Sequence, residues 1–395
     1  MSRQGGGRRN NGVITTDDNR GTFCGMCHKP RPVNDVLAKN SRFKNGKLLF
    51  RCSLVLTRLE VRLTSKQEDY IKSGFKSFEQ WSFPRILNVC IIRGECPCRC
   101  VHCPVGTTEP VERSRRFSRA CMTVDLFKRI ADETALYPHS SIRVHGVGEP
   151  ILWDGLVDAL RYAHSKGVLI WLFTSLVTNN KELIEEISRN CNIIEVSINS
   201  SDPSDYLDTK GIDAFGKVKE NLEFIRAFAL REGTGSRIVA SRVESNNMQR
   251  DQDFMRFWKG SGLVDDAFVR SYHSYNSLMP GRADKEAGRI VRCLVHWNRF
   301  NIDCDGTAVV CFNELFKETF PDSVILGNLN DQTISGVWHS DKLDSIRAAY
   351  IEGDLSKLPF SRDLPCLGCT SCQEEGGDRK TSEFQILNYR GTQGG

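Results

Sequence analysis

Short apolar runs alternate with helical patterns through the middle of the chain. Runs rich in Val, Ile or aromatic residues, each bounded by polar residues or Gly, predict six strands, at 85–92, 141–147, 169–175, 193–199, 237–244 and 266–273. The clearest helical pattern spans 213–230, and another is expected after Thr123, a candidate N-cap. Strands that alternate with helices predict a parallel α/β sheet, in which chemistry gathers at the C-terminal ends of the strands.

Both ends of the chain break this alternation. Residues 1–22 are rich in Gly, Arg and Asn and predict a disordered arm, followed by a small N-terminal segment over 23–83. The alternating region, 84–280, is expected to form the main domain. Cysteines recur while the alternation fades beyond residue 290, which predicts a second, cysteine-bearing domain over 290–380 and a loose tail over 381–395.

The composition excludes membrane and secreted classes. The chain has 395 residues, of which 39% are hydrophobic and 26% charged, and it holds no apolar run long enough to span a bilayer. No apolar segment follows the N-terminal charges, as a secretory signal would require. We therefore expect a cytoplasmic protein with no membrane partner. Its 16 cysteines then lie in a reducing compartment, where clustered thiols bind metal more often than they form disulfides.

The positive charge is concentrated near the N-terminus. Residues 1–84 hold 16 Lys and Arg against 7 Asp and Glu, so +5 for the whole chain minus +9 leaves about −4 on the rest. A basic extension suits an acidic partner such as a nucleic acid or a leader peptide. A solvated extension without a partner is the simpler interpretation, and bound nucleic acid is not expected.

The stretch "CIIRGECPCRCVHCPVG", residues 90–106, holds four closely spaced cysteines. Their spacing is too tight for a zinc ribbon, which uses two separated pairs. Cys96, Cys100 and Cys103, spaced x3 and x2, place three thiolates on one loop that could hold three irons of a [4Fe–4S] cluster and leave the fourth iron open. Cys98 is left over and is expected to point elsewhere, and Cys90 is expected in the core.

This spacing resembles that of the radical S-adenosylmethionine (radical SAM) superfamily, and further stretches extend the resemblance. "VHGVGEPIL" (144–152) resembles the glycine-rich stretch after the second strand, "FTSLVTN" stands where the family often has TNG, and "VSINSSDPSDY" and "ASRVESNN" resemble the segments of strands four and five. Two positions depart from the pattern. His102 stands where an aromatic residue is common, and His145 begins the glycine-rich stretch.

The resemblance implies a partial (β/α)6 TIM-like barrel that binds a [4Fe–4S] cluster and SAM. It implies reductive cleavage of SAM to a 5′-deoxyadenosyl radical, which abstracts hydrogen from a substrate carbon. It also implies an electron donor such as a flavodoxin, a ferredoxin or a reductase. The residues implied to contact SAM are Gly146, Val147, Gly148 and Glu149 at the methionyl ammonium, Ser197 and Asn199 at the ribose, and Arg242 at the carboxylate.

The later cysteines resemble the SPASM/twitch extension of radical SAM enzymes. The stretches "CLVHWNRFNIDCDGTAVVC", "LGNLNDQTISGVWHSDKLDSIR" and "CLGCTSC" carry this resemblance. It implies an auxiliary [4Fe–4S] cluster held by Cys293, Cys311, Cys366 and Cys369, with Cys372 open as a replacement for Cys369. A zinc ion on the same four thiols is the alternative. Cys304 is expected to be structural.

The remaining cysteines carry weaker signals. Cys24, Cys27 and Cys52 are spaced as half of a zinc ribbon, but free thiols are the favoured interpretation and zinc is the alternative. Cys121 and Cys191 are expected to be small buried residues.

Several function classes remain open within the resemblance. If the auxiliary cluster takes an electron from the substrate radical, the net reaction is an oxidation, as in the aminocyclitol dehydrogenases. A peptide maturase that forms a crosslink or oxidises a side chain is the alternative, so the substrate is a small molecule or a peptide. A nucleic-acid-modifying enzyme is favoured only by the basic N-terminal residues. A non-catalytic iron–sulfur protein would have no reason to keep a SAM-binding barrel.

Overall fold

The computed structural model describes residues 77–280, 293 and 295–369, with short strands and single positions nearer the ends of the chain, at 13–14, 41–44, 47–51, 58–61, 68, 74, 75, 386 and 389. The chain divides into two compact units, Met1–Ser82 with Leu136–His139, and Phe83–Ala135 with Ser140–Gly395. Within the described residues no helix is both long enough and apolar enough to cross a membrane.

The first unit contains a four-stranded sheet. Its strand order is β1 (Val13–Ile14), β4 (Arg58–Val61), β3 (Lys47–Arg51) and β2 (Ser41–Lys44), and a short helix, α3 (Phe78–Ser82), follows. Val13 and Ile14 lie in the segment expected to be disordered, and they pair with β4 in parallel. The rest of that segment and Cys24, Cys27 and Cys52 lie outside the described residues, so the choice between free thiols and a zinc site there stays open.

The second unit is built on a nine-stranded sheet that contains the six predicted strands. These are β5 (Ile86–Arg93), β6 (Ser141–Val147), β7 (Leu169–Thr174), β8 (Ile193–Ser197), β9 (Arg237–Val243) and β10 (Asp266–Arg270). They pair in parallel and in chain order from β5 to β10. β10 ends the sheet without pairing to β5, so the fold is an open partial barrel, and the predicted fold class is confirmed.

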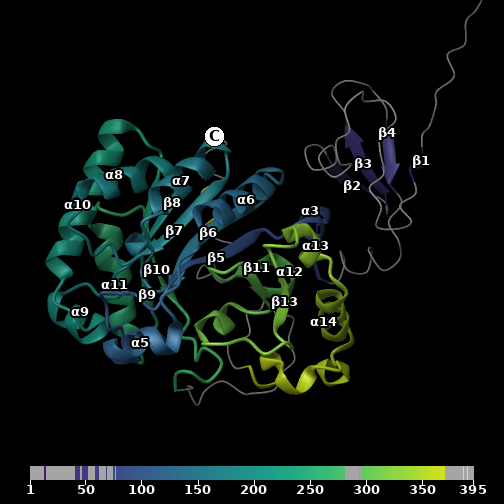
Figure 1. Ribbon diagram of the computed structural model, residues 1–395. Helices are drawn as coiled ribbons and strands as arrows, with labels where there is room; N and C mark the ends of the chain where they lie inside the picture. Colours follow the sequence, from purple (N-terminus) through teal and green to yellow (C-terminus); the bar gives the residue numbers. More distant parts are fainter. Residues whose placement is uncertain are drawn as a thin grey trace, which may run out of the picture. The chain divides into compact units, whose positions relative to one another are not determined.

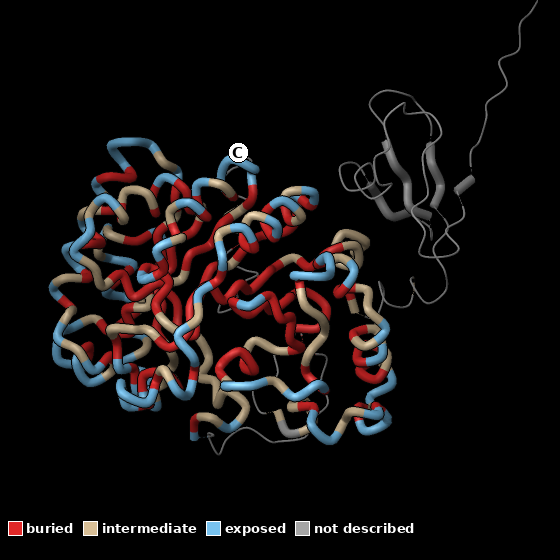
Figure 2. Tube along the Cα trace, viewed as in Figure 1, coloured by how far each residue is buried: buried red, intermediate tan, exposed pale blue. Residues whose placement is uncertain are grey.

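Helices return the chain between the strands and cover the outer side of the sheet (Figure 1). They are α6 (Val124–Ala135), α7 (Leu156–Ser165), α8 (Lys181–Asn190), α10 (Phe215–Glu232) and α11 (Met248–Gly260). The predicted helix at 213–230 is α10, and its periodic apolar residues are all buried: Phe215, Val218, Leu222, Ile225 and Ala229. The Thr123 hydroxyl accepts a hydrogen bond from the Leu126 amide at 3.2 Å, as expected of an N-cap. Figure 2 shows the buried strands inside this half-exposed layer.

The C-terminal cysteine region continues the same sheet. β11 (Arg299–Ile302) pairs in parallel with β5, and β12 (Thr307–Val309) and β13 (Ile325–Asn328) follow in antiparallel order. The remaining elements are α12 (Val295–Asn298), η3 (Phe312–Phe316), α13 (Ile334–Trp338), α14 (Asp341–Glu352), η4 (Leu355–Lys357), η5 (Ser361–Asp363) and η6 (Pro365–Gly368). β11 thus covers the edge of β5, which would otherwise expose unpaired backbone groups.

A buried arginine ties this extension to the barrel. Arg93, at the end of β5, contacts Asp303 at 2.8 Å and donates to the carbonyl oxygens of Phe117 and Leu315, both at 2.8 Å. Both partners of the ion pair are nearly inaccessible to solvent. The start of the cysteine loop is therefore fixed against the turn between β11 and β12.

Candidate active site

The cysteine loop is pinned to the glycine-rich stretch after β6. The Gly94 amide donates to the Val147 carbonyl oxygen, and the Glu149 amide donates to the Glu95 carbonyl oxygen, both at 2.7 Å. A Cβ added at Gly148 would lie 2.5 Å from that Glu95 oxygen, closer than real Cβ atoms approach. Glycine is needed at residue 148 because two backbones touch there.

The other side of the loop is held by α9 (Pro203–Lys210). The Arg99 amide donates to the Lys210 carbonyl oxygen at 2.7 Å, and the Val101 amide donates to the Thr209 carbonyl oxygen at 3.1 Å. These carbonyls belong to the last turn of α9, which lacks internal partners for them. The helix end and the loop satisfy each other's backbone groups.

The loop closes on itself through Gly106 and Arg113. A Cβ at Gly106 would lie 2.3 Å from the Cys100 carbonyl oxygen, so only glycine fits there. The buried Arg113 guanidinium, on α5 (Pro110–Phe117), donates to the carbonyl oxygens of Cys96 at 2.8 Å and Cys98 at 3.2 Å. The backbone around the thiols is fixed from several sides.

Cys98 does not point away from the other thiols, contrary to expectation. Its sulfur accepts hydrogen bonds from the Cys100 and Cys96 thiols, which lower the pKa of Cys98. Cys98 is buried, because the folded loop turns its side chain inward beside those of Cys96 and Cys100. Cys90 lies in the core, as expected. Cys191 is also buried, whereas Cys121 is exposed, so the prediction for Cys121 was wrong.

Glu149 lies buried beside the loop. Its carboxylate accepts hydrogen bonds from the Thr174 hydroxyl at 2.6 Å and the Ser175 amide at 2.8 Å. Burial raises the pKa of Glu149. Gly146 and Gly148 line the cavity next to Glu149, whereas Val147 packs into the core with Cys90.

Of the residues predicted to contact the ribose and the carboxylate of SAM, the structure places one at the cavity and two away from it. Ser197 lines the cavity. Asn199 instead connects β8 to β9, because its side chain donates to the Ser197 hydroxyl at 3.0 Å and accepts from the Val243 amide at 2.7 Å. Arg242 is buried in ion pairs with Asp205 at 2.8 Å and Asp251 at 2.9 Å. Asn199 and Arg242 are not among the described residues that line the cavity, so their contacts with SAM stay predictions.

Lys210 is a site residue that the sequence did not single out. Its ammonium is buried, lines the cavity and donates to the Ser197 carbonyl oxygen at 2.7 Å. Burial lowers the pKa of Lys210, but the thiols of Cys100 and Cys98 outweigh burial and raise it. A lysine just before Gly211, shortly after the strand-four motif, was the available signal.

The later cysteines gather from three segments of chain. Cys293 precedes α12, Cys311 caps η3, and Cys366 and Cys369 lie in and after η6. Burial raises the pKa of Cys311, and the nearby thiols of Cys293 and Cys366 raise it further. The Cys366 sulfur lies 3.6 Å from Nε2 of His296. The structure thus brings the four predicted auxiliary ligands together, while Cys372 lies outside the described residues and Cys304 is buried in the turn after β11.

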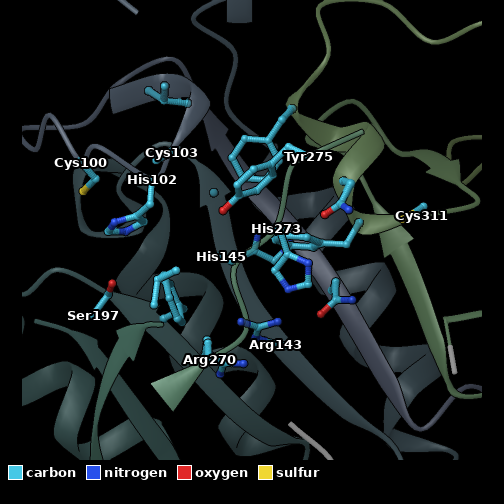
Figure 3. Close-up of a pocket in the computed structure, with 18 of the residues that line it drawn as sticks. Cys100, His102, Cys103, Arg143, His145, Ser197, Arg270, His273, Tyr275 and Cys311 are labelled. Atoms are coloured by element: carbon cyan, nitrogen blue, oxygen red, sulfur yellow. The ribbon is translucent and has the colours of Figure 1, made fainter. Parts of the chain in front are cut away.

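A single cavity of about 380 Å³ is lined by both cysteine sets. Figure 3 shows Cys100, His102 and Cys103 on one side of it and Cys311 on the other. Between them lie Arg143, His145, Arg270, His273 and Tyr275. Phe173 and Phe312 also line the cavity. Burial lowers the pKa of His102 to about 3, so that imidazole is neutral at neutral pH.

The ligand chemistry of both cysteine sets fits iron–sulfur clusters. Cys96 and Cys100 lie beside each other on the loop, and Cys293, Cys366 and Cys369 lie near Cys311. Cysteine thiolates are the ligands that hold such clusters.

Family models match both parts of the second unit. Residues 91–254 match the radical SAM superfamily, and residues 293–373 match SPASM, an iron–sulfur cluster-binding domain. The chain is a radical SAM enzyme with a C-terminal SPASM domain, as the motifs predicted. Its cofactors are SAM, the [4Fe–4S] cluster of the radical SAM core and auxiliary iron–sulfur clusters of the SPASM domain. That the SPASM domain here holds a single cluster stays a prediction.

Solved structures share this fold at low sequence identity. SuiB of Streptococcus suis bound to the precursor peptide SuiA is similar at a TM-score of 0.54 and 13% identity, over 72% of this chain and 76% of that chain. SuiB bound to S-adenosylmethionine gives 0.53 and 14%, over 74% and 78%. Native anSMEcpe with bound AdoMet gives 0.50 and 14%, over 78% and 97%. A search of curated proteins found no match.

Proposed function

We propose that this enzyme oxidises a carbon centre of a substrate bound between its two cysteine sites. The observation that carries the proposal is the cavity lined by both cysteine sets. When bound, SAM and the first cluster supply an organic radical able to abstract hydrogen from an unactivated C–H bond, which acid–base side chains cannot do.

Different residues along the cavity would hold the first cluster and SAM. Cys96, Cys100 and Cys103 would hold the first cluster. Gly146, Gly148, Glu149 and Ser197 would hold SAM, with the ammonium of Lys210 beside them. Glu149 is held in place by Thr174 and Ser175, so a cationic group of SAM would meet a carboxylate that is already oriented.

The auxiliary thiols would supply the electron acceptor. The substrate first loses a hydrogen atom and then a proton. It then still carries one electron more than the oxidised product. Cys293, Cys311, Cys366 and Cys369 would hold an iron–sulfur cluster that takes this electron. An external flavodoxin, ferredoxin or reductase would deliver the electron that starts each turnover.

The substrate class has two candidates. A small molecule such as an aminocyclitol is the first, and a cavity of about 380 Å³ has the volume of a small-molecule site. A peptide substrate is the second candidate. It is supported by the fold likeness to SuiB, which was solved with its precursor peptide SuiA. The basic N-terminal residues that would favour nucleic acid lie largely outside the described residues.

Anaerobic reconstitution tests the proposal. The purified chain with dithionite should form 5′-deoxyadenosine from SAM, and a Cys96/Cys100/Cys103 triple variant should retain the iron–sulfur EPR signal of the auxiliary site. Zinc instead of iron at Cys293, Cys311, Cys366 and Cys369 would contradict the oxidative role, because zinc accepts no electron.

A further inference from the structure

A buried histidine lies against one of the auxiliary thiols. His296, on α12, is 2% exposed and lines the cavity together with Cys293 and Cys366. Its Nε2 lies 3.6 Å from the sulfur of Cys366, whereas its Nδ1 has no hydrogen-bond partner within the described part of the chain. The sulfur is therefore the hydrogen-bond partner that the structure gives this ring.

The surroundings of the ring fix where its proton lies. Burial and the nearby Arg347 guanidinium lower the pKa of His296 to about 3, so the imidazole is neutral and carries one N–H. A cysteine that binds iron is a thiolate, and a hydrogen bond to an ionised acceptor is stronger than one between neutral groups. The N–H therefore belongs on Nε2, where it meets the Cys366 sulfur.

Contacts with α14 hold the histidine in this position. The fully buried Arg347 donates from Nε to the His296 carbonyl oxygen at 2.9 Å and from a second nitrogen to the Trp338 carbonyl oxygen at 2.6 Å. The His296 amide donates to the Cys293 carbonyl oxygen at 3.2 Å. The imidazole packs against the Tyr350 ring, with centroids 5.0 Å apart. Both the backbone and the ring of His296 are thus fixed beside Cys366.

The Cys366 sulfur lies where negative charge is costly. Burial raises the pKa of Cys366 to about 12, and a hydrogen bond from the Tyr350 hydroxyl opposes that rise. Donors to this sulfur stabilise the negative charge that burial disfavours. Reduction adds an electron to an iron–sulfur cluster, and hydrogen bonds to its sulfurs are among the factors that set its reduction potential. A donor to Cys366 therefore favours the reduced state.

We propose that His296 donates a hydrogen bond from Nε2 to the sulfur of Cys366 and thereby raises the reduction potential of the auxiliary cluster. The inference rests on the proposed function, because a higher potential favours transfer of the remaining substrate electron to this cluster. In that step one electron moves from the deprotonated substrate radical to the cluster, and the imidazole keeps its proton. His296 acts through Cys366, so it is a positioning residue and not a ligand.

Redox titration of the full-length, reconstituted enzyme tests the inference. SAM binds at the first cluster, so the EPR signal that SAM leaves unchanged belongs to the auxiliary site. In His296→Leu, at the midpoint potential of the unaltered enzyme, the ratio of reduced to oxidised auxiliary cluster should fall at least tenfold. A tenfold change corresponds to about 59 mV for one electron. The iron content should match that of the unaltered enzyme.

Two amide variants separate the hydrogen bond from packing. A glutamine amide reaches about as far from the backbone as Nε2, whereas an asparagine amide reaches only as far as Nδ1. His296→Gln should therefore keep the potential of the unaltered enzyme, and His296→Asn should shift it as His296→Leu does.

The control for lost stability in the same region is Thr333→Ala. The Thr333 hydroxyl caps α13 by accepting from the Gly336 amide at 3.0 Å. Its loss should lower the free energy of unfolding and leave the potential unchanged.

Equal potentials of His296→Gln and His296→Asn would overturn the inference, as would the same shift in Thr333→Ala. Loss of the auxiliary iron in His296→Gln would also overturn it and would make His296, three residues after Cys293, a ligand. The contrast between the two amides decides the matter even if His296→Leu fails to fold. Failure of the proposed function would appear separately, as zinc in place of iron or absent 5′-deoxyadenosine in the unaltered enzyme.

Discussion

The cysteine loop draws its three predicted ligands from eight consecutive residues, whereas the auxiliary site draws four from segments between residues 293 and 369. The loop is held by its own backbone, by Arg113 and by the end of α9. The auxiliary thiols meet only after β11 has paired with β5 and the chain has passed through α14. The ligands of the first site all lie on one short loop. The ligands of the second site come together only through the tertiary structure of the whole unit.

The largest expected effect separates the ligands of the loop from their neighbour. Cys100→Ala should abolish formation of 5′-deoxyadenosine, because it leaves two thiolates for a three-ligand site. Cys98→Ala should retain activity, although Cys98 lies against the same thiols. The measurement is 5′-deoxyadenosine by chromatography after anaerobic reconstitution. Continued turnover in Cys100→Ala, or complete loss in Cys98→Ala, would reverse the assignment.

The second prediction removes the auxiliary site alone. Cys311→Ala should lower the iron content from about eight per chain to about four, if each site holds one four-iron cluster. Cleavage of SAM should persist, because the cysteine loop keeps its own contacts. Cys304→Ala is the matched control, since Cys304 is also a buried cysteine of the C-terminal region and should leave the iron content unchanged. An unchanged iron content in Cys311→Ala would contradict the ligand set.

The third prediction tests how the loop is held. Gly106→Ala should impair assembly of the first cluster, because the new Cβ would lie 2.3 Å from the Cys100 carbonyl oxygen and 2.4 Å from its nitrogen. The iron that survives should belong to the auxiliary site. Gly216→Ala, on α10 with open space around its Cα, should raise stability by about 0.5–1 kcal/mol. The iron content and the free energy of unfolding in denaturant are measured for both variants. If Gly106→Ala kept as much iron as Gly216→Ala, the loop would not be packed this tightly.

The smallest effect concerns the ion pair between Arg93 and Asp303, which joins the start of the cysteine loop to the turn between β11 and β12. Burial raises the pKa of Asp303, and Arg93 only partly offsets that effect. A raised pKa in the folded state means that protonation favours folding. The contribution of Asp303 to the free energy of unfolding should therefore be present at acidic pH and decline as pH rises through the raised pKa.

Asp303→Asn should remove this part of the pH dependence, because asparagine does not titrate. Urea unfolding at several pH values compares the two proteins. Identical pH slopes would mean that Asp303 does not couple protonation to folding at this junction.

Much of the fold followed from periodicity. All six barrel strands appear where apolar runs predicted them, and α10 buries its periodic face, because each element carries its own pattern of two or 3.6 residues. The continuation of the sheet through β11 did not follow from any pattern. The strand is four residues long, and its pairing with β5 joins segments more than 200 residues apart.

The sequence by itself determined the family, because the spacing of Cys96, Cys100 and Cys103 and the glycines of "VHGVGEP" are local requirements of a loop that two backbones approach closely. Tertiary structure decided which polar residues reach the cavity. In the folded chain Arg242 forms ion pairs with Asp205 and Asp251. Lys210, at the end of α9, lies beside the thiols of the cysteine loop. Tertiary structure also turned Arg143 and His145 into the space between the cysteine sites. A side chain's partners depend on which strands and helix ends become neighbours, and that information is distributed over the whole chain.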